Sequence, residues 1–230
     1  ESLLPLEVPP VPGWSFARLW LPAREVSGDF YDLVDEGPGQ LGLVIADVTD
    51  KGMPASLFMV FALSALRASL VVPPRSPAEA IAAANQLVCR DSFEGLFATL
   101  FYARLMTASG QLTYVNAGHN PPLLYRAREN DLQPLRRTGL PLGVDDDAAY
   151  EQCALQLQPG DFLFLYTDGI TEALDSSGHE FGQERLEREI LALRKSPPEE
   201  IISALRDTLK AFADPAQSFD DITMLVVRRS

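Results

Sequence analysis

The sequence predicts an α+β fold in which two antiparallel sheets stack on each other and a pair of helices covers each outer face. The predicted strands follow one another mostly in hairpin order, and the predicted helices come in two pairs. Several strands, among them 41–46 and 162–167, are apolar along nearly their whole length. Such strands need apolar cover on both faces, and stacked sheets with outer helices provide it.

The chain is expected to contain one domain preceded by a linker. Residues 1–13 carry four prolines and are expected to be extended rather than packed. The sequence motifs described below begin only after this stretch, so the domain is expected to span residues 14–230. Because the chain starts at Glu1 rather than Met, we expect it to be a piece of a longer protein.

The strands are marked by alternating or continuous apolar residues between Gly, Pro and Ser turns. They are expected at 14–21, from Asp29 into a short strand, and at 41–46, 96–105, 111–117, 123–126, 150–157, 162–167 and 222–228. Ser109-Gly110 is expected to join two of them as a hairpin. Residues 127–149 are polar, contain two glycines and a proline in 139–143, and are expected to be mostly loop.

Four helices are predicted from apolar periodicity and capping signals. Pro54 suits the first turn of a helix that ends near residue 70 and is apolar nearly all round, so this helix is expected to be buried. The segment 76–79 is a predicted capping box for a helix that ends near residue 89. An amphipathic pattern predicts a third helix over 181–193, and a second capping box at 196–199 precedes the fourth.

Composition narrows the class of protein. The formal net charge is −13, from 32 acidic and 19 basic residues, which argues against nucleic-acid binding. The two cysteines have no metal-ligand spacing and are expected to be reduced thiols. The longest apolar stretch, 53–66, is interrupted by proline and serine and falls short of the ~18 residues that a membrane span needs. No signal peptide is visible, so a cytoplasmic location is expected.

Acidic residues stand at the ends of three apolar strands. Asp47 follows the strand at 41–46, Asp168 follows the one at 162–167, and Asp220-Asp221 precede the last strand. Asp29 opens a fourth strand. An ionised carboxylate at such a place needs a partner, and a set composed of oxygen ligands alone suits Mg²⁺ or Mn²⁺ rather than zinc. Alternatively, each aspartate caps a turn or a helix.

Eight segments together resemble the SpoIIE/RsbU-type bacterial phosphatases, a branch of the metal-dependent PPM (type 2C) serine/threonine phosphatases. They appear in the family's order and cover nearly the whole chain past residue 13. They are SGDFYD (27–32), IADVTDKGMPASLFM (45–59), LFATLFYARL (96–105), YVNAGHNPPLL (114–124), GLPLGV (139–144), PGDFLFLYTDGITEA (159–173), FGQERL (181–186) and DDITMLVV (220–227).

The resemblance implies an α-β-β-α sandwich with two divalent cations, Mn²⁺ or Mg²⁺, at one edge. It implies that Asp47 bridges both ions, that the Val48 carbonyl contacts one, and that Asp168 and Asp220 are ligands. Asp29 would hold a water of one ion. Asp221 is an alternative ligand to Asp220, which is preferred.

Four further residues bear on phosphate binding or proton transfer. The resemblance implies a small residue or Gly more often than Asp at position 50. Asp50 therefore adds a charge to this loop, either as a solvated turn residue or as an influence on the metals. Lys51 and Arg24 are candidate phosphate contacts, because the arginine of other type 2C enzymes is missing here. His119 is a candidate proton donor, although a structural role bonded to the backbone is favoured.

The resemblance also implies a function and partners. The expected activity is hydrolysis of phosphoserine or phosphothreonine on a protein, with a phosphorylated anti-anti-sigma (STAS) protein as substrate in partner switching. An upstream sensor or dimerisation module and a homodimer are expected in the full-length protein. The alternative from another class is a non-catalytic or conditionally active signalling module of the same fold. A two-metal nuclease is disfavoured by the net charge of −13.

Overall fold

The computed structural model describes residues 4–5, 10–23, 25–71, 76–91, 95–214 and 220–230. Ten strands form two five-stranded sheets, and every paired neighbour is antiparallel. The first sheet has the order β1 (Trp14–Leu21), β10 (Ile222–Arg229), β9 (Phe162–Tyr166), β6 (Leu123–Arg126) and β7 (Asp131–Pro134). The second has the order β2 (Phe30–Asp35), β3 (Gln40–Val48), β4 (Ala98–Met106), β5 (Gln111–Ala117) and β8 (Cys153–Gln156).

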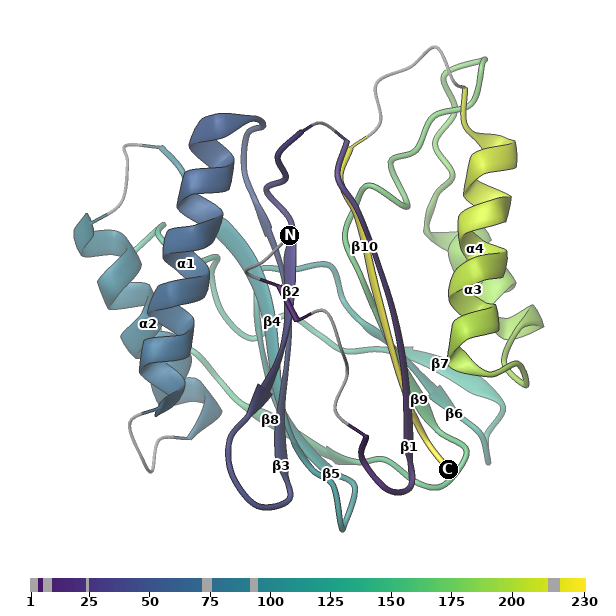
Figure 1. The fold of residues 1–230 in the computed structure, drawn as a ribbon, viewed down its shortest axis with the longest axis horizontal. Helices are drawn as coiled ribbons and strands as arrows, with labels where there is room; N and C mark the ends of the chain where they lie inside the picture. Colours follow the sequence, from purple (N-terminus) through teal and green to yellow (C-terminus); the bar gives the residue numbers. More distant parts are fainter. Residues whose placement is uncertain (1–3, 6–9, 24, 72–75, 92–94, 215–219) are drawn as a thin grey trace.

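Helices cover the outer face of each sheet, which gives the predicted α-β-β-α layering (Figure 1). The helices α1 (Met53–Val71) and α2 (Pro77–Asp91) lie on the second sheet. The helices α3 (Gln183–Ala192) and α4 (Pro198–Phe212) lie on the first. The predicted fold class is therefore confirmed.

Three hydrophobic cores explain why the central strands are apolar on both faces. In β3, Leu43 and Ile45 point into the core between the sheets, whereas Val44 and Ala46 point into the core under α1 and α2. The strand β9 divides its side chains in the same way between the inner core and the core under α3 and α4. Successive side chains of a strand face opposite sides, so each of these strands contributes to two cores.

The helix α1 is long and apolar enough to cross a membrane by length and composition, with a mean hydropathy of 1.7 over its most apolar window. Counted as uninterrupted apolar residues, the stretch 53–66 still falls short of a membrane span, as the sequence predicted. Half of that window is buried inside the protein. Arg67 of α1 also binds Asp32 of β2, with Nε and Oδ2 2.7 Å apart. These contacts show that α1 is a core helix of this fold. A core helix can meet the same length and hydropathy criteria as a membrane-spanning helix.

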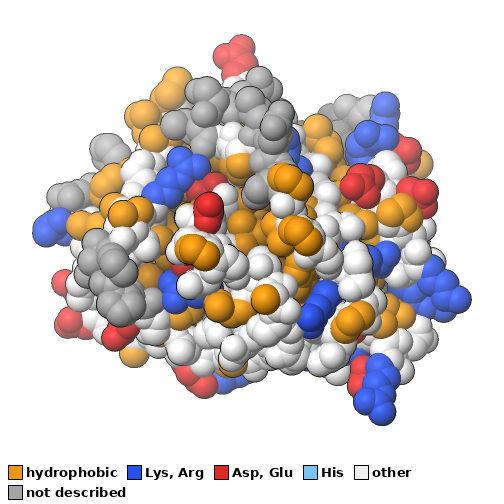
Figure 2. Space-filling model, turned by 60° about the horizontal axis from the view of Figure 1, so that its bottom comes forward, with side chains coloured by type: hydrophobic (Ala, Val, Ile, Leu, Met, Phe, Trp, Pro, Cys, Tyr) orange, Lys and Arg blue, Asp and Glu red, His pale blue; other side chains and the backbone are white. Residues whose placement is uncertain are grey.

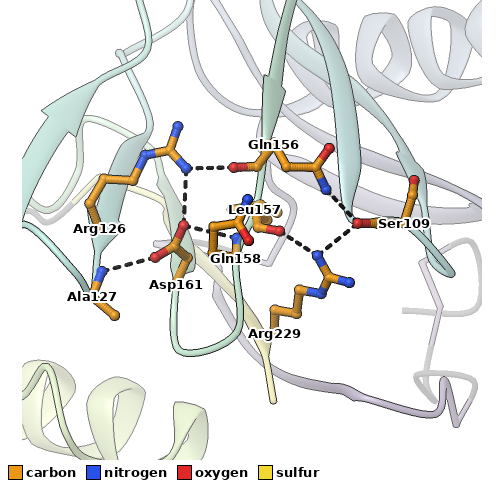
Figure 3. Close-up of polar contacts among 8 residues, drawn as sticks. All are labelled: Ser109, Arg126, Ala127, Gln156, Leu157, Gln158, Asp161 and Arg229. Carbon is orange, nitrogen blue, oxygen red and sulfur yellow. Dashed lines mark hydrogen bonds and ion pairs between the residues drawn. The ribbon is translucent and has the colours of Figure 1, made fainter.

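Polar contacts made by Arg126 and Arg229, here called the polar clasp, join the two sheets at the edge where the Ser109-Gly110 turn lies (Figure 3). Arg229 at the end of β10 donates through Nη1 to the carbonyls of Ser109 and Leu157, at 2.7 and 2.6 Å. Arg126 at the end of β6 donates through Nη1 to the carbonyl of Gln156, at the end of β8, and to the buried carboxylate of Asp161 at 3.0 Å. The arginines thus connect the first sheet to turns of the second, far along the strands from the acidic strand ends.

The surface near this edge mixes residue types. Figure 2, with the lower edge of Figure 1 brought forward, shows Lys and Arg side chains spread among hydrophobic and acidic ones. The basic side chains on this face are therefore dispersed rather than gathered into one patch.

Several element predictions differ from the structure. The strand β7 lies in the predicted loop 127–149; it is an edge strand of mostly exposed residues that ends in a proline, so no apolar pattern marked it. The strand β8 is shorter than the predicted 150–157, because Glu151 donates its amide to Thr138 and leaves the ladder. Leu4 is buried and the Pro5 carbonyl accepts a hydrogen bond from Tyr31, so the segment 1–13 is packed at these two residues.

One predicted capping box forms and the other does not. The Ser76 amide and hydroxyl both contact Glu79 Oε2, at 2.8 and 2.9 Å, which confirms the box before α2. At α4 the N-cap residue is Pro197, without a side-chain cap, and Pro198 opens the helix. The segment 196–199 is therefore out of register by one residue for a capping box.

Candidate metal centre

The ends of β3 and β9 and the starts of β2 and β10 lie at one edge of the sandwich, at the top of Figure 1, and their carboxylates come close together there. Asp47 is the second-last residue of β3, and Asp29 precedes β2. Asp168 follows β9 by two residues, and Asp220 precedes β10 by two. Because β3 belongs to one sheet and β9 and β10 to the other, the cluster spans both sheets.

Asp29 is held by two hydroxyl groups of the opposite sheet. Its Oδ2 accepts hydrogen bonds from Thr167 Oγ1 at 2.7 Å and Thr223 Oγ1 at 2.8 Å. Only 1% of Asp29 is exposed. Burial, followed by the charge of Asp47, raises the pKa of Asp29 well above its usual range, and the two hydroxyls oppose that rise.

Asp47 lies between Asp29 and the exposed part of the cluster. Burial and the charge of Asp168 raise the pKa of Asp47 to about 7. The next carbonyl, that of Val48, faces Gly28 so closely that a Cβ on Gly28 would lie 3.2 Å from it. The glycine therefore lets the loop before Asp29 approach the end of β3.

Glu172 joins the cluster, and sequence reasoning missed it. Single carboxylate oxygens of Asp168, Glu172 and Asp220 lie within 4.8 Å of one another. The Glu172 amide donates to the Asp168 carbonyl at 2.8 Å, which turns the chain back toward the cluster. The spacing of four residues between the two acids in TDGITEA was the available signal, since one helical turn brings such residues to one side.

Asp220 and Asp221 have different roles. Both oxygens of Asp221 accept hydrogen bonds from the loop before β2: Oδ1 from the Ala23 amide at 2.7 Å, and Oδ2 from the Ser27 hydroxyl at 2.7 Å and the Gly28 amide at 2.8 Å. Asp221 therefore fastens the segment that carries Asp29. Asp220 instead faces the cluster, which favours it as the ligand of the pair.

The donor set fits hard divalent cations. Burial raises the pKa of Asp29, Asp47 and Asp168, and in each case a neighbouring carboxylate adds to the rise. Crowded carboxylates of this kind repel one another unless positive charge lies among them. The candidate donors are carboxylate oxygens and one backbone carbonyl, which are ligands that Mg²⁺ and Mn²⁺ accept.

Comparison with known proteins identifies the family. A family model described as Stage II sporulation protein E (SpoIIE) matches residues 37–230. The chain belongs to the SpoIIE family. This membership confirms the SpoIIE/RsbU-type domain of the PPM (type 2C) phosphatases that the sequence motifs indicated.

Three relatives illustrate the similarity of this SpoIIE-family chain. Phosphoserine phosphatase RsbU of Bacillus subtilis (strain 168) is 31% identical over 229 residues, covering all of this chain and 67% of RsbU. Protein IcfG of Synechocystis sp. is 31% identical over 256 residues, covering all of this chain and 40% of IcfG. The structure of the RsbU and RsbW domains of Rv1364c from Mycobacterium tuberculosis is 26% identical with a TM-score of 0.80, covering 95% of this chain and 60% of that one.

Asp50 adopts a backbone conformation that favours glycine. Its φ is +72°, in the left-handed region, which Gly enters freely and Asp more readily than most residues. Its Oδ1 accepts the Lys51 amide at 2.8 Å. Asp50 is exposed, which agrees with a solvated turn residue.

Of the candidate phosphate contacts, Lys51 reaches the cluster. Its Nζ lies 2.8 Å from Asp220 Oδ2, and nearly half of its side chain is exposed. The ammonium group therefore neutralises part of the acidic cluster in this arrangement. Arg24 lies outside the described residues.

His119 is a structural residue of the SpoIIE-family fold. Only 1% of it is exposed. Its Nε2 lies 3.1 Å from the Tyr166 carbonyl, which can only accept, so Nε2 carries the proton. Nδ1 then accepts from Thr99 Oγ1 at 2.8 Å. Both ring nitrogens are bonded within the protein, which agrees with the structural role that the sequence favoured.

We expect His119 to stay neutral well below neutral pH, because burial lowers its pKa to about 4. The unfolded chain, with a histidine pKa near ~6.5, then binds more protons between about pH 6.5 and 4, so the free energy of unfolding falls by up to about 3 kcal/mol through that window. Imidazole ¹⁵N chemical shifts measure this directly, since the chain has two histidines. A midpoint near 6.5 for the buried ring would contradict the assignment.

Proposed function

We propose that this domain hydrolyses phosphoserine or phosphothreonine on a partner protein, using two divalent cations, Mn²⁺ or Mg²⁺. The convergence of Asp29, Asp47, Asp168 and Asp220 from both sheets is the observation that carries the proposal. Family membership supports it, as does the 31% identity to a protein named phosphoserine phosphatase RsbU. A non-catalytic module would have no use for four mutually repelling, partly buried carboxylates.

Each residue has a proposed task. Asp47, central in the cluster, would contact both cations, with the Val48 carbonyl beside it. Asp168 and Asp220 would hold the cations from the first sheet, and Glu172 adds negative charge at the exposed side. Asp29, fixed by Thr167 and Thr223, would orient a water. When bound, the cations supply the positive charge that favours phosphate binding and a deprotonated attacking water.

Lys51 is suited to charge balance during turnover. Its side chain is flexible and already lies over Asp220. When cations neutralise the cluster, the ammonium group is released to meet a phosphate oxygen at the exposed edge.

The proposed substrate is a phosphorylated STAS protein in a partner-switching pathway, with a cytoplasmic setting. Support comes from the relatives: RsbU is named a phosphoserine phosphatase, and the Rv1364c structure joins RsbU and RsbW domains. The chain spans 40% of IcfG and 60% of the Rv1364c chain, so these relatives contain further segments. The same proposal includes an upstream sensor or dimerisation module and a homodimer of the full-length protein.

We expect phosphorylated protein to be a much better substrate than a short phosphopeptide of the same sequence. The carboxylate cluster would hold the cations that bind the phosphate, but it offers few groups to read a peptide, so affinity must come from a folded surface. Steady-state kinetics on the two substrates, at saturating Mn²⁺, give the ratio of kcat/KM. Equal efficiency would contradict recognition of a folded partner.

The activity itself is tested with the small ester para-nitrophenyl phosphate. Hydrolysis is expected with Mn²⁺ or Mg²⁺ and is expected to disappear with chelator and to return when metal is restored. Hydrolysis that persists in chelator would contradict metal dependence. Absence of hydrolysis with either metal, on the small ester and on the phosphorylated protein, would favour the non-catalytic alternative.

A further inference from the structure

A cavity of about 700 Å³ opens beside the acidic cluster, between the edge strand β1 and the helix α4. Asp220 lines this cavity and is also part of the cluster, so the cavity borders the cluster. Most of the other lining side chains are apolar; they include Leu19, Leu21, Pro22, Leu209, Ile222 and Met224. The proposed catalytic tasks make no use of this space.

The walls of the cavity are firm parts of the fold. Leu209 and Met224 are buried, and both belong to the core under α3 and α4. The strand β1 pairs with β10 along its whole length, from Trp14 opposite Arg229 to Leu21 opposite Ile222. The helix α4 packs on both strands (Figure 1). The cavity is therefore formed before any ligand arrives, as is typical of binding sites.

Leu21 is a large apolar wall residue that remains open to solvent. It is 42% exposed at the end of β1, next to the segment that Asp221 fastens. A large apolar side chain in this position gains free energy when another apolar group covers it.

Two basic residues stand at the rim. Arg206 and Lys210 lie four residues apart on α4, so they project from the same side of the helix. Arg206 pairs with Asp207, at 2.8 Å. Within the described part of the chain, Lys210 has no ion pair. The whole chain has a net charge of −13, so a negatively charged partner is repelled at long range and needs local positive charge to dock.

We propose that this cavity is a docking site for the phosphorylated protein substrate. It receives an apolar side chain that the substrate presents beside its phosphoserine or phosphothreonine, and Lys210 pairs with a carboxylate on the same substrate surface. Because Asp220 borders both the cavity and the cluster, a substrate surface whose phosphate lies at the cluster also meets the cavity. The inference rests on the proposed function and assigns to it a specificity site outside the metal centre.

The test compares two substrates, a STAS protein phosphorylated on serine and para-nitrophenyl phosphate. Lys210→Glu is expected to lower the ratio of kcat/KM for the protein to kcat/KM for the ester about tenfold, mainly by raising KM for the protein, because a rim charge acts on encounter and binding. Lys195→Glu makes the same charge change at an exposed lysine that does not line the cavity, and it is expected to keep the wild-type ratio.

Leu21→Gln tests the apolar wall independently. A similar fall in the ratio is expected, because a hydrophobic pocket that loses apolar complementarity discriminates by about tenfold or more. Val71→Gln, at an exposed apolar residue of α1, is the control. Wild-type ratios in both Lys210→Glu and Leu21→Gln, or equal losses on the two substrates, would overturn the docking site. Wild-type protein that hydrolyses neither the ester nor the phosphorylated protein, with Mn²⁺ or Mg²⁺, would instead overturn the proposed function and this inference with it.

Discussion

Asp47→Asn is expected to remove hydrolysis of a phosphoester by at least ~100-fold while it stabilises the metal-free protein. Loss of one carboxylate that serves both cations weakens both, so the activity falls by orders of magnitude. In the absence of metal, the ionised Asp47 carboxylate lowers the free energy of unfolding. Its pKa of about 7 in the folded protein lies above the usual 3.8, so folding binds protons between these values and stability falls as pH rises through them.

At pH 8 that effect is fully present, and the variant is expected to gain up to about 4 kcal/mol in metal-free free energy of unfolding. Asp131→Asn, on the exposed edge strand β7, is a matched control that is expected to change neither property. Denaturant unfolding in chelator and ester hydrolysis in Mn²⁺ give the two measurements. A variant that is both active and less stable without metal would contradict the role of Asp47.

Gly169→Ala is expected to destabilise the protein by about 3 kcal/mol and to lower ester hydrolysis about 100-fold. A Cβ at this position would lie 2.1 Å from the carbonyl oxygen of Asp221. The obstructing atoms are backbone, so they can move only together with Asp220 and Asp221. Such a shift of about 1 Å displaces ligands on both sides of the cluster, which explains the loss of activity.

Gly28→Ala is the graded comparison. Its Cβ would lie 3.2 Å from the Val48 carbonyl, so a displacement of a few tenths of an ångström accommodates it. We expect a smaller loss of stability, about 1 kcal/mol, and a smaller loss of activity. Equal effects of the two substitutions would show that steric fit at the metal loops does not control the site.

Much of the fold follows from pattern alone. Apolar strands such as β3 and β9 must face two cores, and this requirement predicts stacked sheets with helices outside. The short polar strand β7 was not predicted, because an edge strand with exposed side chains has no apolar pattern. The first residue of α4 was also predicted wrongly by one position, because either Pro197 or Pro198 could open the helix.

The site was predictable where chemistry is carried by acids at strand ends. Asp29, Asp47, Asp168 and Asp220 all stand beside apolar strands, and the structure brings them to one edge. Thr167 and Thr223 could not be found in this way, because a hydroxyl in a strand is usually only a packing residue. The role of Asp221, which fastens the loop before β2, also could not be predicted, because the sequence does not specify the path of that loop.

The most direct test of the account is a calorimetric titration of Mn²⁺ into the wild-type protein and into Asp47→Asn. The account predicts two bound ions per wild-type chain and a loss of affinity of at least ~100-fold for both in the variant, because the two ions share this carboxylate. Asp131→Asn should bind as the wild type does. An unchanged stoichiometry and affinity in Asp47→Asn would contradict a two-metal centre built around the end of β3.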